Sequence, residues 1–418
     1  MGSITNTSVT KINRRSIVWM IWGIASIFYG YQYILRVMPN VIMPEILQQF
    51  NIDATVFGQF SGVYYLGYSL MHLPIGILLD RFGPKKVMPI CILLTGVGML
   101  PLIMSDFWIY PILGRALIGM GSSAAILGTF KIIRLTFKEE QFTRMLSFSV
   151  MIGLVGAIYG GGPLNYLCSH FGYQAVIYVL ILIALGLSFL TYIIVPNVES
   201  EHQTGIWADI KEVLLSPKVL GICFLAGLMV GPLEGFADVW GGAFLKQVYG
   251  YDSEVAASLP SAIFLGMCFG APVLSYIAEK SKNYIATIMG AGIIMALGFF
   301  ILLSGKMSFS MMSTLFIVIG VCCAYQIIAI YKASTYVKEH VVGLTTALAN
   351  MIIMIFGYFF HSLIGWIINT SGGTQNVESF LYGIAVIPIT LSIAVLGFFI
   401  FKRSLAYSHC SQPATSDR

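Results

Sequence analysis

The chain is very apolar for its length. Of its 418 residues, 57% are hydrophobic and only 10% are charged, whereas soluble domains carry about 25% charged residues. A soluble fold could not solvate so apolar a surface. The net charge of +5 does not indicate nucleic-acid binding, because the basic residues form no stripe and sit in short loops. The seven cysteines lack metal-ligand spacing and are interpreted as free thiols.

Twelve apolar segments are long enough to cross a bilayer, which takes about 20 helical residues. The first six segments fall near residues 16–38, 55–79, 86–105, 109–132, 143–168 and 172–195. The last six fall near residues 217–245, 254–278, 284–304, 308–331, 341–368 and 378–401. The sequence therefore predicts an all-α integral membrane protein of twelve transmembrane helices. Its expected domains are an N-terminal bundle (1–196), a cytoplasmic linker (197–216) and a C-terminal bundle (217–418).

The positions of Lys and Arg predict the orientation of these segments. With the N-terminus in the cytoplasm, 19 of the 23 basic residues fall in cytoplasmic tails and loops, as the positive-inside rule requires. Lys246 and Lys306 fall outside, and Arg36 and Arg115 lie within segments. Both termini are expected in the cytoplasm. The lack of a targeting peptide or a long glycosylated loop favours a bacterial inner membrane, and an organelle membrane is the alternative.

The two halves of the chain share a weak internal repeat. Asp80-Arg81 follows the second segment and Glu279-Lys280 follows the eighth, 199 residues later and close to half the chain length. Internal duplication of this kind is common in secondary transporters. We therefore expect two six-helix bundles related by a pseudo-two-fold axis.

The loop after the second segment carries a recognisable motif. The motif residues are Gly76, Asp80, Arg81, Gly83, Lys85 and Lys86. This pattern resembles the signature loop of the major facilitator superfamily, although His72 stands where that family usually has Gln. Gly114-Arg115-xxx-Gly119-x-Gly121 and Gly160-Gly161-Gly162-Pro163 resemble the family's fourth and fifth helices. The resemblance covers the whole chain and implies a transporter that works by alternating access.

The loop motif is expected to act as a gate. Asp80 can pair with basic groups or meet the N-terminus of a helix from the other half, which would close the cytoplasmic side in one state. Gly83 permits the tight turn. The alternative is that these charges only set the orientation of the helices.

Four ionisable residues lie inside the apolar segments, where charge is costly and indicates function. They are Arg36, Arg115, Glu234 and Asp238. The family resemblance implies that they surround one central site. Arginines bind carboxylate or phosphate groups through a planar fork, so Arg36 and Arg115 are predicted to bind an anion. The segment around Arg36 also resembles organic-anion symporters of this family, except that Leu35 stands where an acid often precedes the arginine.

Glu234 and Asp238 are predicted to couple transport to protons. They lie four residues apart on one helical face, after a Gly231-Pro232 break. Two carboxylates so placed in a low dielectric disfavour double ionisation, so one of them should hold a proton. The alternative is a static arrangement in which the two arginines simply neutralise the two acids.

Several uncharged polar residues could contact a ligand or only pack against neighbouring helices. These candidates are Tyr29, Gln32, Tyr65, Tyr325, Gln326 and Asn350. No Walker loop, zinc spacing or nucleophile elbow occurs. We therefore expect no enzyme activity, no catalytic residue, no metal and no cofactor.

The favoured function is uptake of a small organic anion, a carboxylate or phosphate, together with protons. The expected partners are the solute, protons and the lipid bilayer, with no nucleic acid, and the protein is expected to be a monomer. Transport of amino acids or dipeptides is the first alternative. Export of a polycarboxylate siderophore or a drug is the second. A non-transporting membrane sensor or scaffold is an alternative of another class.

Overall fold

The computed structural model describes residues 15–197, 206–305, 307–338 and 341–410, and it contains twelve helical spans long and apolar enough to cross a membrane. The first six spans are α1 (Arg15–Val37), α3 (Ala54–Phe82), α4 (Pro84–Met99) with α5 (Pro101–Met104), α6 (Ile109–Thr136), α7 (Phe142–Tyr159) and α9 (Tyr173–Ile194). The seventh is built from α11 (Pro217–Gly227), the π-helical segment η2 (Gly231–Trp240) and α12 (Gly241–Tyr249). The remaining spans are α13 (Ser253–Ser258) with α14 (Ser261–Ser281), α15 (Tyr284–Leu302), α16 (Phe309–Cys323) with α17 (Tyr325–Ser334), α18 (Val342–Thr370) and α19 (Val377–Cys410).

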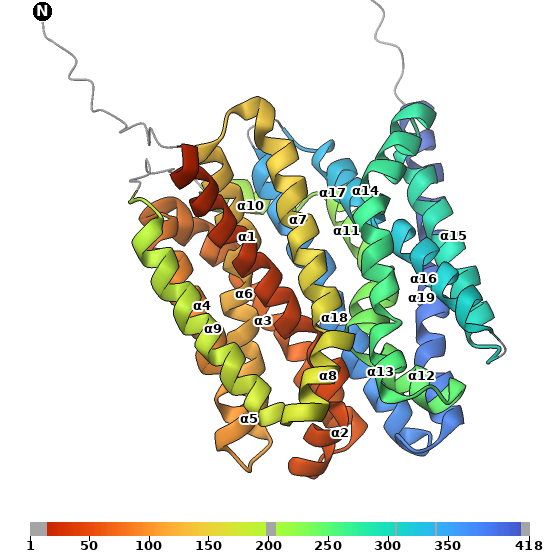
Figure 1. Cartoon of the computed structure of the whole chain (residues 1–418). Coiled ribbons are helices and arrows are strands. Elements are labelled where there is room, and N and C mark those ends of the chain that lie inside the picture. The colour runs from red at the N-terminus through yellow and green to blue at the C-terminus, as the bar shows by residue number, and fades with distance from the viewer. Residues whose placement is uncertain (1–14, 198–205, 306, 339–340, 411–418) are drawn as a thin grey trace, which may run out of the picture.

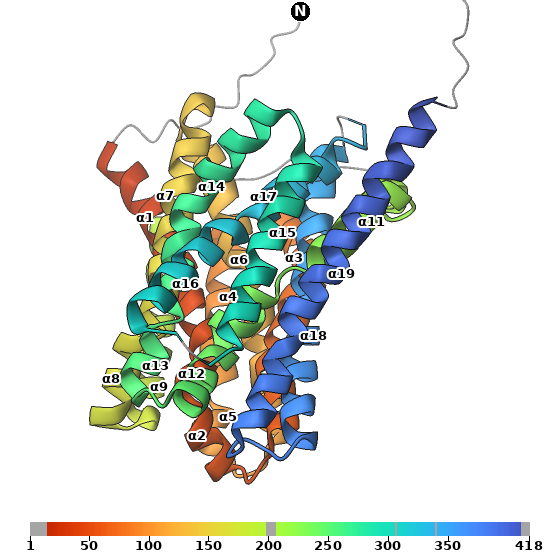
Figure 2. The same cartoon turned by 90° about the vertical axis from the view of Figure 1, so that its right-hand side faces the viewer.

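The spans form two bundles that stand side by side (Figure 1), with α4 and α9 on one flank and α15, α16 and α19 on the other. The protein is thus a multi-pass integral membrane protein. Short elements join the spans: α2 (Pro39–Gln49), the 3-10 turn η1 (Glu139–Gln141), α8 (Gly162–Phe171) and α10 (Ile206–Leu214). In the view turned by 90°, α2, α8, α12 and α13 gather at one end of the molecule (Figure 2).

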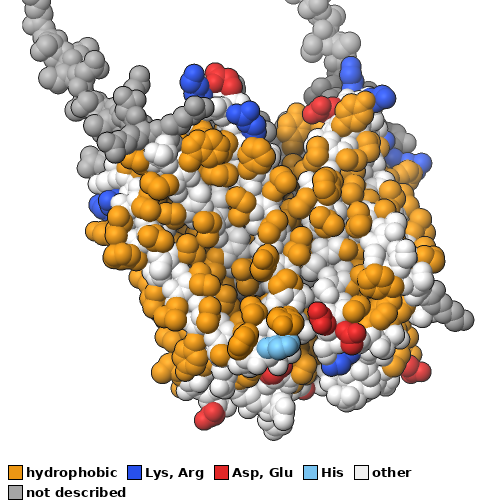
Figure 3. Space-filling view, viewed as in Figure 1, with side chains coloured by type: hydrophobic (Ala, Val, Ile, Leu, Met, Phe, Trp, Pro, Cys, Tyr) orange, Lys and Arg blue, Asp and Glu red, His pale blue; other side chains and the backbone are white. Residues whose placement is uncertain are grey.

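The surface separates apolar from basic side chains. Large apolar side chains such as Leu182, Phe189 and Phe269 are exposed around the flanks, as expected for contact with lipid. Figure 3 shows Lys and Arg mainly at the end where α1 begins and α19 ends. We call this the basic end (residues 80–86, 131–144, 280–282 and 332–338) and the opposite one the far end (residues 39–53, 161–172, 246–253 and 371–377).

The two halves pack along α3 and α18, and along α7 and α14. Glycines allow the helices to approach closely: a Cβ atom at Gly357 would come within 2.5 Å of Tyr65 Cγ. Hydrogen bonds also join the halves at the far end. Asn40 Oδ1 accepts from the Gly242 backbone N–H at 3.0 Å, and Asp53 Oδ2 accepts from Asn369 Nδ2 at 3.0 Å.

The fifth predicted span was wrong at its far end. The segment 143–168 was expected to be one helix, but α7 ends at Tyr159 and α8 begins at Gly162. Pro163 lies at the start of α8, where a missing backbone N–H does no harm. The glycines before it also bring the chain against the second half, because a Cβ atom at Gly161 would lie 2.7 Å from Ser261 Oγ.

Some sequence predictions lie partly outside the described residues. Of the predicted linker 197–216, residues 198–205 are not described, while α10 covers Ile206–Leu214. Beside it, Glu212 of α10 pairs with Lys338 at 3.5 Å. The basic residues Lys11, Arg14, Lys306 and Arg418 also lie outside the described residues.

Candidate functional site

Arg36 lies at the centre of an ion-pair cluster between the two halves. Its Nε donates to Asp238 Oδ2 at 2.6 Å, and its Nη2 donates to Glu234 Oε2. Arg36 is 7% exposed and the two acids are 1% or less. The guanidinium comes from α1 and both carboxylates come from η2, so the cluster bridges the first and second halves.

The local sequence explains how both acids reach one arginine. Pro232 is the second residue of η2, and the Gly241 N–H at its end bonds back to the Phe236 carbonyl, five residues earlier. Such π-helical turns are rare and often mark functional sites. Glu234 and Asp238 thereby present their carboxylates to the same side.

Tyr65 of α3 completes the cluster. Its hydroxyl lies 2.5 Å from Glu234 Oε2 and also contacts Asp238 Oδ2, and its ring lies 5.2 Å from the Arg36 guanidinium carbon. Gly357 of α18 gives the ring its space, as described above. The Tyr65 hydroxyl therefore contacts the two acids in this structure, and its predicted contact with solute stays a prediction.

Two further polar contacts complete the surroundings of the acids. Gln326 of α17 places Nε2 at 3.5 Å from Glu234 Oε1. Asp238 Oδ1 is buried and has no hydrogen-bond partner among the described residues. One carboxylate oxygen at the centre of the protein is therefore free to accept a proton or a donor.

Arg115 of α6 lies in a different environment from Arg36. Its Nη1 donates to the Leu35 carbonyl at 2.7 Å, and its guanidinium carbon lies 5.0 Å from the Tyr64 ring centroid and 5.6 Å from that of Phe60. It is 1% exposed, and Nε has no hydrogen-bond partner among the described residues. No described carboxylate is within salt-bridge distance of Arg115. This buried guanidinium keeps donor capacity for a ligand.

The remaining predicted contact residues are less tightly grouped. Gln32 accepts a hydrogen bond from the Tyr64 hydroxyl at 2.6 Å, beside Arg115. Tyr29 packs edge-on against Tyr33, whose own ring lies 5.0 Å from the Arg36 guanidinium carbon. Tyr325 donates to the Ala226 carbonyl at 2.7 Å, which makes it a bond between helices of one half.

Asn350 is partly buried on α18, near the Tyr68 hydroxyl of α3. It therefore lies where α18 of the second half packs against α3 of the first.

The loop motif lies at the basic end, away from the ion-pair cluster. Asp80 Oδ1 accepts from Lys131 Nζ at 2.8 Å, so its partner belongs to the same half. Of the two partners expected from the sequence, a basic group or a helix N-terminus of the other half, Asp80 thus has the basic group in this conformation. Gly83 has a φ of +76°, a conformation that favours glycine. Lys85 Nζ lies 5.5 Å from the Tyr192 ring centroid.

A cavity of about 780 Å³ opens at the far end between the two halves. Neither Arg36 nor Arg115 lines it. Both arginines are instead buried in this conformation, Arg36 in the bridge between the halves and Arg115 among residues of the first half. Among the described residues, no group of three or more His, Cys, Asp or Glu side chains is arranged to hold a metal ion.

Sequence reasoning gave too little weight to several residues at these places. Tyr33, Tyr64 and Lys131 contact Arg36, Arg115 and Asp80 respectively, yet none was among the predicted site residues. His361 is fully buried with its ring centroid 5.4 Å from that of Tyr65. The available signal was spacing: Tyr33 precedes Arg36 by three residues, which is one helical turn.

Comparison with known proteins identifies the family. The Major Facilitator Superfamily matches residues 21–361. The uncharacterized transporter YybO of Bacillus subtilis is 32% identical over 151 residues, which are 32% of this chain and 33% of the relative. The chloramphenicol resistance protein CraA of Acinetobacter baumannii is 23% identical over 54% of this chain and 56% of the relative. The probable sulfoacetate transporter SauU of Cupriavidus necator is 27% identical over 25% of each chain.

The chain thus spans a quarter to just over half the length of these curated relatives. Solved structures match over nearly their full length. A bacterial homolog of the human lysosomal transporter Spinster, inward-facing and unoccupied, has a TM-score of 0.73 at 16% identity, covering 94% of this chain and 98% of that one. A mutant of the nucleoside transporter NupG has a TM-score of 0.76 at 12% identity, covering 91% and 99%.

At these identities the structural likeness shows the fold alone, and it is the fold expected from the sequence: twelve spans in two six-helix bundles. The family match adds the lineage, because it extends over most of the chain, from α1 into α18. The chain belongs to the Major Facilitator Superfamily.

Proposed function

We propose that this protein is a secondary active transporter that works by alternating access and takes up a small organic anion together with protons. The observation that carries this proposal is the bridge from Arg36 to Glu234 and Asp238 across the two halves. A carboxylate or phosphate of the solute would compete with these acids for the same guanidinium.

The balance of buried charge couples the anion to a proton. Arg36 and Arg115 contribute two positive charges, and Glu234 and Asp238 contribute two negative charges, so the enclosed site is neutral. A monovalent anion entering alone would leave one uncompensated negative charge in a low dielectric, which costs several kcal/mol by order of magnitude. A proton that enters with the anion removes this cost.

The hydrogen-bond geometry around Tyr65 supports the acids as the proton site. A hydroxyl carries one proton, yet the Tyr65 oxygen contacts an oxygen of Glu234 and one of Asp238. Once a proton has entered, the protonated acid can donate to the Tyr65 oxygen while the Tyr65 hydroxyl donates to the other acid. Protonation also weakens the hold of the acids on Arg36, which would then bind the solute.

Arg115 would provide the second contact to the anion. Its buried guanidinium has no carboxylate partner among the described residues, and its Nε is unpaired. Gln32, next to it through Tyr64, would bind polar groups of the solute.

Movement of the two halves would expose this site to each side in turn. Hydrogen bonds at the far end, between Asn40 and Gly242 and between Asp53 and Asn369, must break for that end to open. At the basic end, the pair of Asp80 and Lys131 holds α3 to α6 and would keep the gating loop rigid. Positive charge at the basic end favours a cytoplasmic location for it and for both termini. We further propose a bacterial inner membrane and a monomer.

The names of the relatives support an organic anion but leave a competing solute class. SauU is named for sulfoacetate, a small anion, whereas CraA is named for chloramphenicol resistance, which favours drug export. The four buried ionisable side chains favour an organic anion. An uncharged drug could not replace the ion pairs of Arg36 that must break when these side chains separate. An amino acid is the second candidate, since an arginine and an acid could bind its carboxylate and its ammonium group.

Uptake into proteoliposomes tests the proposal. Purified protein is reconstituted and offered radiolabelled monocarboxylates, sulfonates, sugar phosphates, amino acids and chloramphenicol, with and without an inward proton gradient. We expect an anion to accumulate only with the gradient, and Arg36→Gln to abolish this uptake while the protein still reaches the membrane. Normal uptake by Arg36→Gln would contradict the anion site, and accumulation of chloramphenicol alone would favour the drug alternative.

A further inference from the structure

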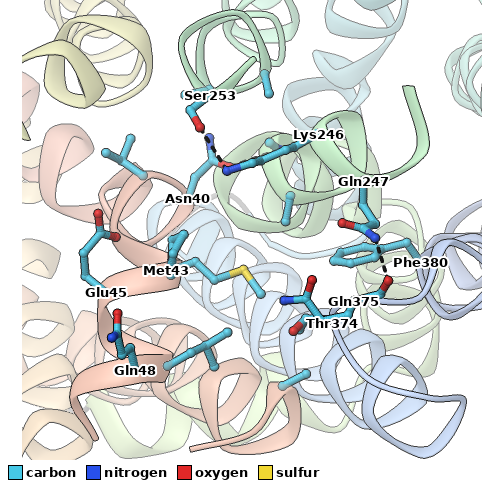
Figure 4. A pocket seen from close by; sticks show the side chains of 18 of the residues that line it. Asn40, Met43, Glu45, Gln48, Lys246, Gln247, Ser253, Thr374, Gln375 and Phe380 are labelled. Atoms are coloured by element: carbon cyan, nitrogen blue, oxygen red, sulfur yellow. Dashed lines mark hydrogen bonds between the residues drawn. The ribbon is translucent and has the colours of Figure 1, made fainter. Parts of the chain in front are cut away.

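The cavity at the far end contains polar groups that the proposed transport site does not use. It is lined by α2 and α8 of the first half and by α12, α13 and the connection from α18 to α19 of the second half (Figure 4). Its volume of about 780 Å³ is within the range of small-molecule sites. Three residues in it have hydrogen-bond donors or acceptors that no described residue uses: Asn40, Lys246 and Glu45.

Asn40 places an unpaired donor at the inner side of this cavity. The residue is 7% exposed; its Oδ1 accepts from the Gly242 N–H at 3.0 Å, and its Nδ2 has no partner among the described residues. Buried amide donors without a partner are uncommon and costly. Asn40 follows Arg36 by four residues, across the short break at Met38 between α1 and α2. The lining of the cavity thus begins four residues along the chain from the ion-pair cluster.

Lys246 supplies positive charge from the other half. Its Nζ donates to Ser253 Oγ at 3.0 Å (Figure 4), which uses one of its three donors. The sequence placed Lys246 outside the cytoplasmic set of basic residues, on the side from which uptake would start. An ammonium at this position can bind a carboxylate.

Glu45 supplies an acceptor from α2, on the first half. Its Oε2 is buried and has no hydrogen-bond partner among the described residues. Asp53 also lines the cavity, but its Oδ1 accepts from the Val56 N–H at 2.9 Å and its Oδ2 accepts from Asn369 Nδ2. Of these two acids, Glu45 is the one with an oxygen left for a ligand.

We propose that this cavity is an outer binding site for the solute, and that it selects small carboxylates that also carry a hydroxyl or amino group. Lys246 and Asn40 bind the carboxylate, and Glu45 accepts a hydrogen bond from the hydroxyl or amino group. A carboxylate without such a group meets only repulsion from Glu45, so the acid discriminates against it. This inference rests on the proposed function and narrows its solute class.

Matched ligands test this selection without relying on transport. Binding of glycerate and propionate, which have the same number of carbons, is measured on purified protein by saturation-transfer NMR. We expect glycerate to bind about tenfold more tightly than propionate, the size of effect of one hydrogen bond to a charged group. Glu45→Gln should reduce this preference, and Lys246→Gln should weaken the binding of both ligands. Equal binding of the two ligands to the wild type would overturn the selection.

A second background separates this site from the ion-pair cluster. Arg36→Gln/Asp238→Asn removes one charge of each sign, so the buried charge stays balanced. Glycerate should still bind to this variant, and adding Lys246→Gln should remove the binding. If the double variant loses glycerate while Lys246→Gln alone binds it normally, the ligand occupies the central cluster and the outer site does not exist.

Asp53→Asn is the matched control. It removes the same charge as Glu45→Gln from the same cavity, but the oxygens of Asp53 are already engaged and Asn still caps the helix. The preference for glycerate should stay as in the wild type, and an equal loss in both variants would contradict a specific role for Glu45. Absence of flux from wild-type protein that binds glycerate would count against the proposed function and leave the outer site standing.

Discussion

The two halves of the protein share an architecture but carry opposite buried charges. Arg36 and Arg115 lie in the first half, and Glu234 and Asp238 lie in the second. Either half alone would bury two charges of one sign, which is strongly unfavourable. The halves therefore stabilise one another through charge, and any ligand that changes this charge changes how firmly they hold together.

The two arginines of the first half differ in whether a carboxylate neutralises them. Arg36 makes ion pairs with both acids, whereas Arg115 donates to a backbone carbonyl and stacks on aromatic rings. Under the proposed function the difference would separate two tasks: Arg36 would respond to protonation of the acids in the second half before it binds the solute, and Arg115 would offer donors to the solute throughout. The following predictions test this division.

The largest effect is expected from breaking the bridge on one side only. Arg36→Gln leaves two buried carboxylates without their cation, and loss of one partner of a buried pair costs about 3–5 kcal/mol. Arg36→Gln/Asp238→Asn should recover much of this loss, because one charge of each sign is removed. Thermal unfolding in detergent measures both variants. Equal melting temperatures for the single and double variants would show that the halves are not held by this charge balance.

Neutralising the second half should uncouple transport from protons. In Glu234→Gln/Asp238→Asn no acid competes for Arg36, so the anion should bind without a proton and uptake should no longer respond to a pH gradient. Counterflow of labelled solute at equal pH on both sides checks that the variant still binds and moves the anion. Unchanged stimulation by the gradient would place proton coupling elsewhere.

Removing the unpaired arginine should affect affinity more than stability. Arg115→Gln leaves the Leu35 carbonyl without its donor but leaves no carboxylate without a cation. The expected loss of stability is therefore about 1–3 kcal/mol, below that of Arg36→Gln. Solute affinity should fall about tenfold or more, as expected when a charge-assisted hydrogen bond is lost. Arg115→Lys is the control, since it keeps the charge and loses the planar fork. An unchanged KM in Arg115→Gln would remove this residue from the solute site.

The smallest effect on stability is expected at the basic end. The pair of Asp80 and Lys131 is partly solvated, with the Asp80 side chain 60% exposed, and such pairs contribute about 1 kcal/mol or less. Lys131→Met should therefore leave the melting temperature nearly unchanged but slow transport if the pair keeps the gating loop in place. Lys338→Met removes the exposed pair with Glu212 outside this loop and serves as the control. Equal transport rates in both variants would make the Asp80 pair a structural contact only.

The fold followed from the sequence because a bilayer imposes simple requirements. Apolar length and the positions of Lys and Arg located twelve spans. Apart from the far end of the fifth span, their ends agree with the structure within a few residues, as in the first span, expected at 16–38 and found at 16–37. Local backbone changes were harder to foresee. Gly160-Gly161-Gly162-Pro163 and Gly231-Pro232 mark the break after Tyr159 and the start of η2 in the sequence, but such patterns do not specify where a helix stops or that the next turns are π-helical.

The candidate site was only partly accessible from the sequence. Charged residues within apolar segments stand out by type alone, and Arg36, Glu234 and Asp238 meet in the structure. The sequence could not say which arginine takes the acids, because that depends on how far each side chain reaches across the interface. For the same reason the acid partners of Tyr65, and the link between Asp80 and Lys131, appeared only with the structure.

The winding of the seventh span ties the proposed proton site to the far end. A π-helical turn contains more residues than an α-helical one, so η2 covers less height than the same residues would as an α-helix. If η2 rewound into an α-helix, the span would become longer. Gly242, which lies just past η2, would then move relative to Asn40 and strain the hydrogen bond between them. The backbone that carries Glu234 and Asp238 thus also sets the position of Gly242, whose hydrogen bond to Asn40 joins the two halves at the far end.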